Sequence, residues 1–184
     1  MRNIFRLLIA LLALSALGGC TAYKVAVDER SVGQIYDDEA ITFQIEKEFL
    51  ADDNVNYLDF KAFSYLGNVY VVGEYETEAQ RDRAVAIARS FSDVRSVSTY
   101  LLPKVDVAGC STTESLRISA QLDKELLEDK YVTGTNVDTK LIQCRAVLLG
   151  LVGSQSELDR AVSIASQIPG VRQVKSFLRV YRGN

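Results

Sequence analysis

Asp82-Arg-Ala-Val-Ala-Ile-Ala88 returns 77 residues later as Asp159-Arg-Ala-Val-Ser-Ile-Ala165, and this repetition decides the fold. The same offset continues without a gap toward the amino terminus, where residues 41–50 align with residues 118–127. Solenoid units run to about 20–50 residues, so a longer repeat indicates two complete small domains. Each copy is marginal alone, and we expect the two copies to pack on each other.

Each copy begins with a pattern typical of a helix followed by two strands. Ile118, Leu122 and Leu126 lie four residues apart and therefore share one helix face. In residues 69–73, Val69, Val71 and Gly73 alternate with Tyr70 and Val72, a period of two that indicates a strand.

A second helix and a last strand complete each copy. Capping-box patterns, Thr77-x-x-Gln80 and Ser154-x-x-Glu157, open the second helix at the same repeat position. The last strands are expected at residues 97–101 and 174–180. We therefore predict an α+β fold of two tandem αββαβ domains, each with two helices on one face of a small mixed three-stranded sheet.

The amino terminus has the features of an export signal. Arg2 and Arg6 precede an apolar run over residues 7–17, which is too short to span a bilayer. The run ends in Leu17-Gly-Gly-Cys20, which resembles a bacterial lipobox. We predict a lipoprotein signal peptide over residues 1–19 and a lipid anchor, including palmitate, on Cys20. The alternative is an ordinary signal peptide followed by a chance cysteine.

The remaining chain divides at the repeat boundaries. We expect an N-terminal linker over residues 20–36, a first domain over 37–104, a linker over 105–112 and a second domain over 113–182. Thr21 stands where aspartate would retain an enterobacterial lipoprotein in the inner membrane, so the sequence favours the periplasmic side of the outer membrane.

Composition excludes several function classes. Residues 20–184 hold 19 basic and 24 acidic side chains, and this acidic balance argues against nucleic-acid binding. The chain has no histidine, the commonest general base and metal ligand. No nucleophile elbow, phosphate-binding loop or Cys-x-x-Cys motif occurs, so we expect no enzyme, cofactor or metal. Asp37-Asp38-Glu39 and Asp52-Asp53 are interpreted as helix ends or solvated turns, and the alternative is a weak Ca²⁺ site.

Two cysteines remain once Cys20 carries lipid. Cys110 and Cys144 form an even pair in an oxidising compartment, where disulfides persist, so we predict that they are bridged. The alternative is two buried free thiols. Sequence separation alone does not establish that their Cα atoms come within about 7 Å.

The strand and helix motifs together resemble the BON domain. The first copy contributes residues 67–75, Gly-x-Val-x-Val-x-Gly-x-Tyr, and Val-x-x-Val at 94–97; the second contributes residues 146–152 and 170–174. With the lipobox, the chain resembles the dual-BON-domain lipoproteins of the DolP/OsmY group. That resemblance implies an envelope location, no enzymatic activity, and phospholipid binding linked to outer-membrane integrity. Cys144 replaces the family glycine, so the second hairpin turn must differ or be held by the disulfide.

Charge and helix pattern suggest where lipid would bind. Residues 37–103 carry a net charge of −7 and residues 114–184 a net charge of +2, so only the second copy suits an anionic bilayer. An apolar line flanked by cations lies opposite the core stripe of its first helix. The hypothesised lipid-contact residues are Leu116, Arg117, Ala120, Lys124 and Leu127. Alternatively, Leu116 and Leu127 pack against the other domain or end the helix.

The last strand offers a second candidate surface. Lys175, Phe177, Arg179 and Tyr181 alternate onto one face and suit a headgroup or a partner protein. The alternative is the solvated outer side of a sheet, or a seam between the domains. Two functions therefore remain: a module that binds anionic phospholipid and supports outer-membrane integrity, or an adaptor that docks an outer-membrane assembly or cell-wall complex without binding lipid.

Overall fold

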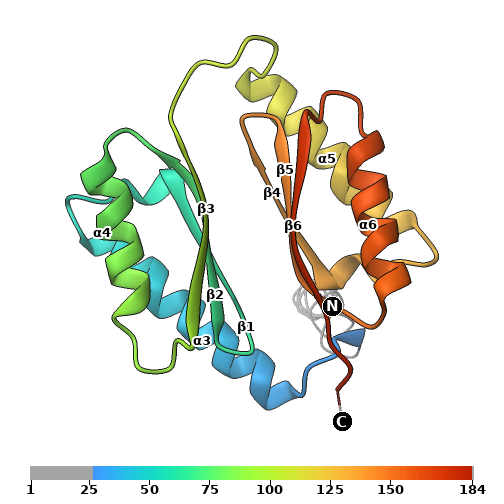
Figure 1. The fold of residues 1–184 in the computed structure, drawn as a ribbon, viewed down its shortest axis with the longest axis horizontal. Coiled ribbons are helices and arrows are strands. Elements are labelled where there is room, and N and C mark those ends of the chain that lie inside the picture. Colours follow the sequence, from blue (N-terminus) through green and yellow to red (C-terminus); the bar gives the residue numbers. More distant parts are fainter. Residues whose placement is uncertain (1–26, 184) are drawn as a thin grey trace, which may run out of the picture.

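Two copies of an αββαβ unit make up residues 27–183, the part of the chain that the computed structural model describes (Figure 1). The first unit consists of α3 (Val32–Ala51), β1 (Phe60–Tyr65), β2 (Asn68–Tyr75), α4 (Glu78–Arg89) and β3 (Ser96–Pro103). The second consists of α5 (Thr112–Glu128), β4 (Val137–Ile142), β5 (Arg145–Val152), α6 (Gln155–Gln167) and β6 (Gln173–Val180). Short 3-10 turns, η1 (Tyr57–Asp59) and η2 (Gly134–Asn136), precede β1 and β4. The predicted fold class and element order are confirmed.

Side-chain caps set where these helices begin. Each N-cap hydroxyl accepts a hydrogen bond from the backbone N–H three residues later, which satisfies a donor that has no partner inside the helix. The N-caps of α3, α4, α5 and α6 are Ser31, Thr77, Ser111 and Ser154. The Gln34 side chain in turn accepts a hydrogen bond from the Ser31 backbone N–H, which completes a capping box. The first helix therefore begins at Val32, inside the segment 20–36 that was expected to be a linker.

Both sheets are mixed, as predicted. In each, the middle strand pairs antiparallel with the strand before it and parallel with the strand that follows the helix. The orders are β1-β2-β3 and β4-β5-β6. The parallel pairing requires the crossover that α4 and α6 supply.

The molecule has four layers, with helices outside and the two sheets inside (Figure 1). One face of each sheet packs against its own two helices, giving one apolar cluster per domain. The opposite faces pack against each other. That inter-domain cluster is formed by Tyr65, Tyr70, Val72, Ile142, Val147, Leu149 and Leu151. Strands β2 and β5 are therefore buried on both faces, which explains their nearly continuous apolar sequences.

A glycine at the same repeat position allows each middle strand to pass close to the preceding segment. A Cβ atom on Gly73 would lie 2.0 Å from the carbonyl oxygen of Asp59, and one on Gly150 would lie 2.0 Å from that of Asn136. No side chain fits at such distances. The repeated glycine is thus required by backbone approach.

The two hairpin turns share one conformation, although only the first contains glycine. The φ angles are 55° and 74° at Leu66 and Gly67, and 50° and 58° at Gln143 and Cys144. Cys144 therefore occupies the left-handed region that normally favours glycine. It is joined to Cys110 by a disulfide with a Cα–Cα distance of 5.8 Å. Of the two possibilities, a different turn or a turn held by a disulfide, the structure has the second.

Within residues 27–183, no helix combines the length and hydrophobicity needed to cross a bilayer. The expected signal peptide and the predicted lipid attachment site, Cys20, lie outside the described residues.

Candidate membrane-facing site

The outer face of α5 carries the five residues predicted to contact lipid. Leu116 is 68% exposed and Leu127 is 60% exposed, so neither packs against the first domain. Arg117, Ala120 and Lys124 are also exposed. The opposite face of the helix is buried through Ile118, Leu122 and Leu126. The structure thus gathers the five residues on one solvent-facing side.

The charges on this face are partly offset within the helix. The Arg117 guanidinium donates to both carboxylate oxygens of Glu114, at 3.0 and 2.7 Å, and to the carbonyl of Pro169 at 2.9 Å. The hydrogen bond from Arg117 lowers the pKa of the Glu114 carboxyl. The Lys124 ammonium lies 3.8 Å from Glu128. Exposed apolar side chains, more than the helix's own cations, distinguish this face.

An aromatic residue just after α5 extends the site and was not identified from the sequence. Tyr131 is an exposed large side chain four residues beyond Leu127. The Lys130 ammonium lies 4.7 Å from the centre of its ring, a cation–π distance. The adjacent Lys-Tyr pair was the available signal, because tyrosine and lysine together suit a membrane interface.

The segment that leads from Cys20 meets the second domain near the end of α5. The Asn136 side-chain amide donates to the carbonyl of Val27 at 2.9 Å. Asn136 belongs to η2, whose Gly134 backbone approaches Leu126 so closely that a Cβ atom there would lie 2.5 Å from the Leu126 carbonyl oxygen. Six residues separate Cys20 from Val27. Fully extended, a stretch of that length spans at most about 24 Å.

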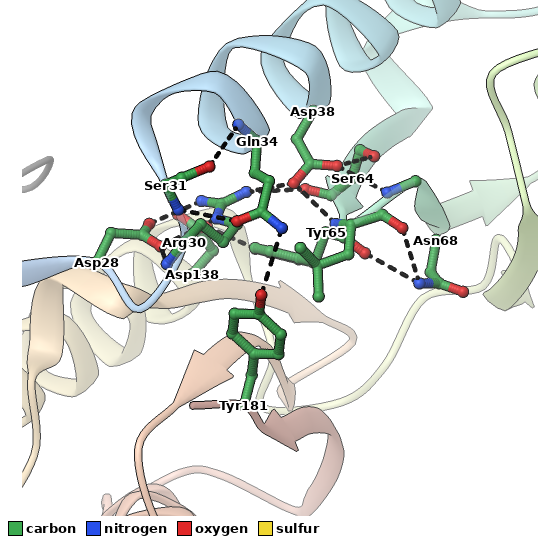
Figure 2. A network of polar contacts seen from close by, with 12 residues as sticks. Asp28, Arg30, Ser31, Gln34, Asp38, Ser64, Tyr65, Asn68, Asp138 and Tyr181 are labelled. Atoms are coloured by element: carbon green, nitrogen blue, oxygen red, sulfur yellow. Dashed lines mark hydrogen bonds and ion pairs between the residues drawn. The ribbon is translucent and has the colours of Figure 1, made fainter. Parts of the chain in front are cut away.

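A buried polar network fastens the same amino-terminal segment to the first domain (Figure 2). The Arg30 guanidinium lies between two carboxylates, 2.8 Å from Asp28 and 2.7 Å from Asp38. Burial by itself would lower the pKa of Arg30, but hydrogen bonds and charge from both carboxylates outweigh burial and raise it. Residues 28–30, which lie in the segment 20–36 predicted to be an N-terminal linker, therefore contact the folded first domain.

Asp38 also holds the first hairpin turn. Its carboxylate accepts hydrogen bonds from the backbone N–H groups of Leu66 and Gly67, at 2.8 and 2.9 Å, and from the Ser64 hydroxyl at 2.8 Å. The residue is 2% exposed. Its interpretation as part of a helix end or solvated turn was wrong, because α3 extends amino-terminally and brings this position onto the sheet.

The network continues across the boundary between the domains. The Tyr65 hydroxyl donates to Asp138 of β4 at 2.6 Å, and Arg30 lies 5.3 Å from the centre of the Tyr65 ring. The Gln34 amide donates to the Tyr181 hydroxyl at 3.3 Å (Figure 2). Polar contacts from α3 and β1 thus reach the first strand of the second domain's sheet, β4, and the residue that follows its last strand, β6.

In the alternative surface on the last strand, the two aromatic residues pack inside the molecule and the two basic residues are exposed. Phe177 and Tyr181 pack against the inter-domain cluster, with the ring centres of Phe177 and Tyr70 5.2 Å apart. Lys175 lies over the Phe177 ring at 4.8 Å, and Arg179 is exposed. Phe177 and Tyr181 therefore lie in the seam between the domains, which was one of the alternatives for this strand.

Tyr65 gives this network a pH dependence that can be measured. Burial, together with the charge of and hydrogen bond to Asp138, raises the pKa of the Tyr65 phenol well above its ordinary value. A raised folded-state pKa contributes stability that is fully present below the unfolded-state value of about 10 and is lost as pH rises toward the folded-state value. Urea unfolding measures the free energy of unfolding at each pH. Between about pH 10 and 11.5, we expect this free energy to fall by roughly 1 kcal/mol per pH unit more in the wild type than in Tyr65→Phe. The control variant Tyr36→Phe changes an exposed residue and should show the same pH dependence as the wild type. If Tyr65→Phe also showed that pH dependence, the assignment to Tyr65 would be contradicted.

Comparison with known proteins adds a family match to this geometry. Residues 37–102 and 115–181 each match the BON domain model. The chain is 30% identical over 163 residues to "Outer membrane lipoprotein DolP" of Haemophilus influenzae, covering 85% of this chain and 81% of that protein. It is 30% identical over 158 residues to "Osmotically-inducible protein Y" of Escherichia coli, covering 85% and 79%. A protein of Anaplasma centrale described only as uncharacterized is 25% identical over 145 residues, covering 78% and 95%.

Proposed function

The chain belongs to the BON-domain family, and we propose that it is a lipid-anchored outer-membrane protein whose second domain binds anionic phospholipid and so supports the integrity of that membrane. Its similarity to a protein named as an outer membrane lipoprotein supports this location on the periplasmic side. The proposed role is one of binding, and no step in it requires catalysis.

The observation that carries the proposal is the exposed apolar line on α5 beside the point where the amino-terminal segment docks. Leu116 and Leu127 project from the helix face opposite the core. The hydrogen bond between Asn136 and Val27 holds Val27, seven positions after Cys20, at the carboxyl end of this helix. An anchored lipid raises the local concentration of headgroups around α5, so a weak interfacial contact suffices.

Charge supports the choice of the second domain. Residues 114–184 carry a net charge of +2, whereas residues 37–103 carry −7. Each Lys or Arg near an anionic surface contributes about 1 kcal/mol, and the attraction falls off within a Debye length. Exposed Lys130 and Lys124 lie at or near the carboxyl end of α5. Binding should therefore require anionic lipid and weaken with salt.

The direct test is co-sedimentation of the unlipidated chain, residues 21–184, with vesicles. The described helices, strands and apolar clusters lie within residues 27–183, so this chain retains each of them. Vesicles that contain phosphatidylglycerol or cardiolipin are compared with purely zwitterionic vesicles at low and moderate salt. We expect salt-sensitive binding to the anionic vesicles only.

Leu116→Glu combined with Arg117→Glu should abolish vesicle binding without unfolding the domain. The change places acids on the exposed face of α5 and removes both an apolar side chain and a cation. A control of equal charge change, Leu58→Glu with Arg89→Glu, alters exposed positions of the first domain and should bind as the wild type does. Since Arg117 also contacts Pro169, a milder pair, Leu116→Ser with Leu127→Ser, should lower vesicle binding at least about tenfold. Unchanged binding in both variants would refute the assignment to α5.

Failure of the wild type to bind either kind of vesicle would leave Cys20 as the membrane link. The protein would then act as an adaptor that docks an outer-membrane assembly or cell-wall complex through its folded domains.

A further inference from the structure

A pocket opens in the first domain where α3 meets the β1–β2 turn and the loop that precedes β3. It has a volume of about 690 Å³, and its lining includes Asp37, Ala40, Gln44, Ser92, Asp93 and Arg95. Within residues 27–183, the side chains of Asp37, Gln44 and Arg95 form no hydrogen bond or ion pair. These polar groups are therefore available to a ligand.

The second domain shows what stands at the corresponding place in the other copy. The offset of 77 residues sets Arg117 at the position of Ala40. The Arg117 guanidinium donates to the Glu114 carboxylate at 2.7 Å, to the Gln121 side-chain oxygen at 3.1 Å and to the Pro169 carbonyl at 2.9 Å. At the positions of these three acceptors, the first domain has Asp37, Gln44 and Ser92.

The first domain thus keeps the acceptors but lacks the guanidinium on α3. Ala40 contributes only a methyl group to the pocket, and Asp93, in the place of Gly170, adds a second carboxylate. A guanidinium suits such a set, because its five N–H donors form a planar fork that can meet several oxygen acceptors at once. The pocket therefore has the space and the acceptors for an arginine side chain supplied from outside the domain.

A main-chain segment also lies at this place in the second domain. The connection between β3 and α5 passes the β4–β5 turn (Figure 1), where the disulfide joins Cys110 to Cys144. The Arg172 guanidinium donates to the carbonyl of Ala108 in that connection. The second domain thus shows an arginine of the loop before the last strand holding an extended peptide by its backbone.

Arg95 is the counterpart of Arg172 and has the same backbone setting. Its N–H donates to the carbonyl of Gly67 at 2.8 Å, as the N–H of Arg172 does to that of Cys144. The segment that precedes α3 takes a different path, because its Val27 carbonyl accepts from Asn136 of the second domain. Arg95 is therefore left without the carbonyl partner that Arg172 has.

We propose that this pocket binds an extended peptide segment of a partner protein, with an arginine side chain in the place of Arg117 and a main-chain carbonyl at Arg95. The ligand must offer a cation and an oxygen acceptor a short distance apart, and a peptide that contains arginine offers both. The carboxylates of Asp37 and Asp93 disfavour an anionic headgroup here. The site is separate from the exposed face of α5 and does not depend on lipid binding there.

Three small probes separate the parts of this recognition. One acetylated six-residue peptide of alanine, serine and glycine carries a single central arginine. The second carries citrulline, which keeps the shape of arginine without its charge, and the third probe, ethylguanidinium, has the cation without a peptide main chain. Nitrogen–proton correlation spectra of residues 21–184 measure the affinity of each. We expect the arginine peptide to bind at least about tenfold more tightly than either of the others.

Variants with matched controls locate the binding. Ala40→Arg supplies the missing guanidinium from within α3 and should weaken binding of the arginine peptide at least about tenfold. Ala51→Arg adds the same side chain at the exposed carboxyl end of α3 and should leave binding unaltered. Asp37→Asn should weaken binding at least about fivefold, whereas Asp53→Asn, at an exposed acid beyond α3, should not. Arg95→Ala should remove the advantage of the peptide over ethylguanidinium.

Several results would overturn the proposal. Equal binding of the citrulline peptide, or no binding of the arginine peptide at millimolar concentration, would exclude a site for arginine. Binding that survives Ala40→Arg would place the site elsewhere. Equal affinity for ethylguanidinium would assign the pocket to small cations. Binding that appears only after residues 21–26 are removed would identify the occupant as the chain's own amino-terminal segment. Near-UV circular dichroism that matches the wild type shows that each variant is folded.

Discussion

Asp38→Ala is expected to lower the free energy of unfolding by about 3–5 kcal/mol, among the largest losses for a single substitution in this chain. The carboxylate is buried and accepts hydrogen bonds from two backbone N–H groups, from the Ser64 hydroxyl and from Arg30. Its removal leaves the Arg30 charge with Asp28 as its remaining carboxylate, and leaves the N–H groups of the turn without an acceptor. Urea unfolding followed by far-UV circular dichroism measures the loss.

Neighbouring positions on α3 supply the control for this prediction. Asp37→Ala changes the same net charge at an exposed residue and should cost less than about 1 kcal/mol. Ser115 occupies the position of Asp38 in the second copy, so Ser115→Ala tests whether the repeat position itself is sensitive. A loss under about 1 kcal/mol for Asp38→Ala would mean that the buried network does not stabilise the turn.

Removing the disulfide by Cys110→Ser with Cys144→Ser should cost about 3–4 kcal/mol. The bond closes a loop with a sequence separation of 34. Closing a loop of that size lowers the conformational entropy of the unfolded chain, which stabilises the folded state by about this amount. It also ties the inter-domain connection to the second hairpin turn. Urea unfolding with and without a reductant measures the effect; the reductant should destabilise the wild type and leave the double variant unchanged.

A second variant separates the cross-link from the strain of the turn. Cys110→Ser with Cys144→Gly also removes the bond, but restores the glycine that the first copy has at Gly67. Glycine adopts the positive φ of this position without penalty, so this pair should recover about 1 kcal/mol relative to the serine pair. Equal stability of the two pairs would indicate that Cys144 is not strained.

Repetition and periodicity were sufficient to predict the architecture. Two copies at a fixed offset define the domains, and residues such as Ile118, Leu122 and Leu126 define the buried helix faces because local spacing determines which side chains share a face. Gly73 and Gly150 occupy the same repeat position because, in each domain, the middle strand passes close to the backbone of the preceding segment at that point. These features depend on interactions inside one domain.

What the sequence did not reveal depends on contacts between distant segments. Asp38 resembled its exposed neighbours in a run of three acids, and only the position of α3 on the sheet buries it. The inter-domain seam was one of two alternatives for Phe177 and Tyr181, since alternation in a strand does not distinguish solvent from a partner sheet.

The amino-terminal segment has a consequence for the order in which the molecule is completed. Val27 and Gln34 contact Asn136 and Tyr181, which are separated from them by more than a hundred positions in the chain. Contacts between such distant segments form slowly, because a long loop must close before they stabilise anything. The contacts of the amino-terminal segment thus wait for the last strand, and a product cut short near its carboxyl end would lack the Tyr181 contact of its first helix.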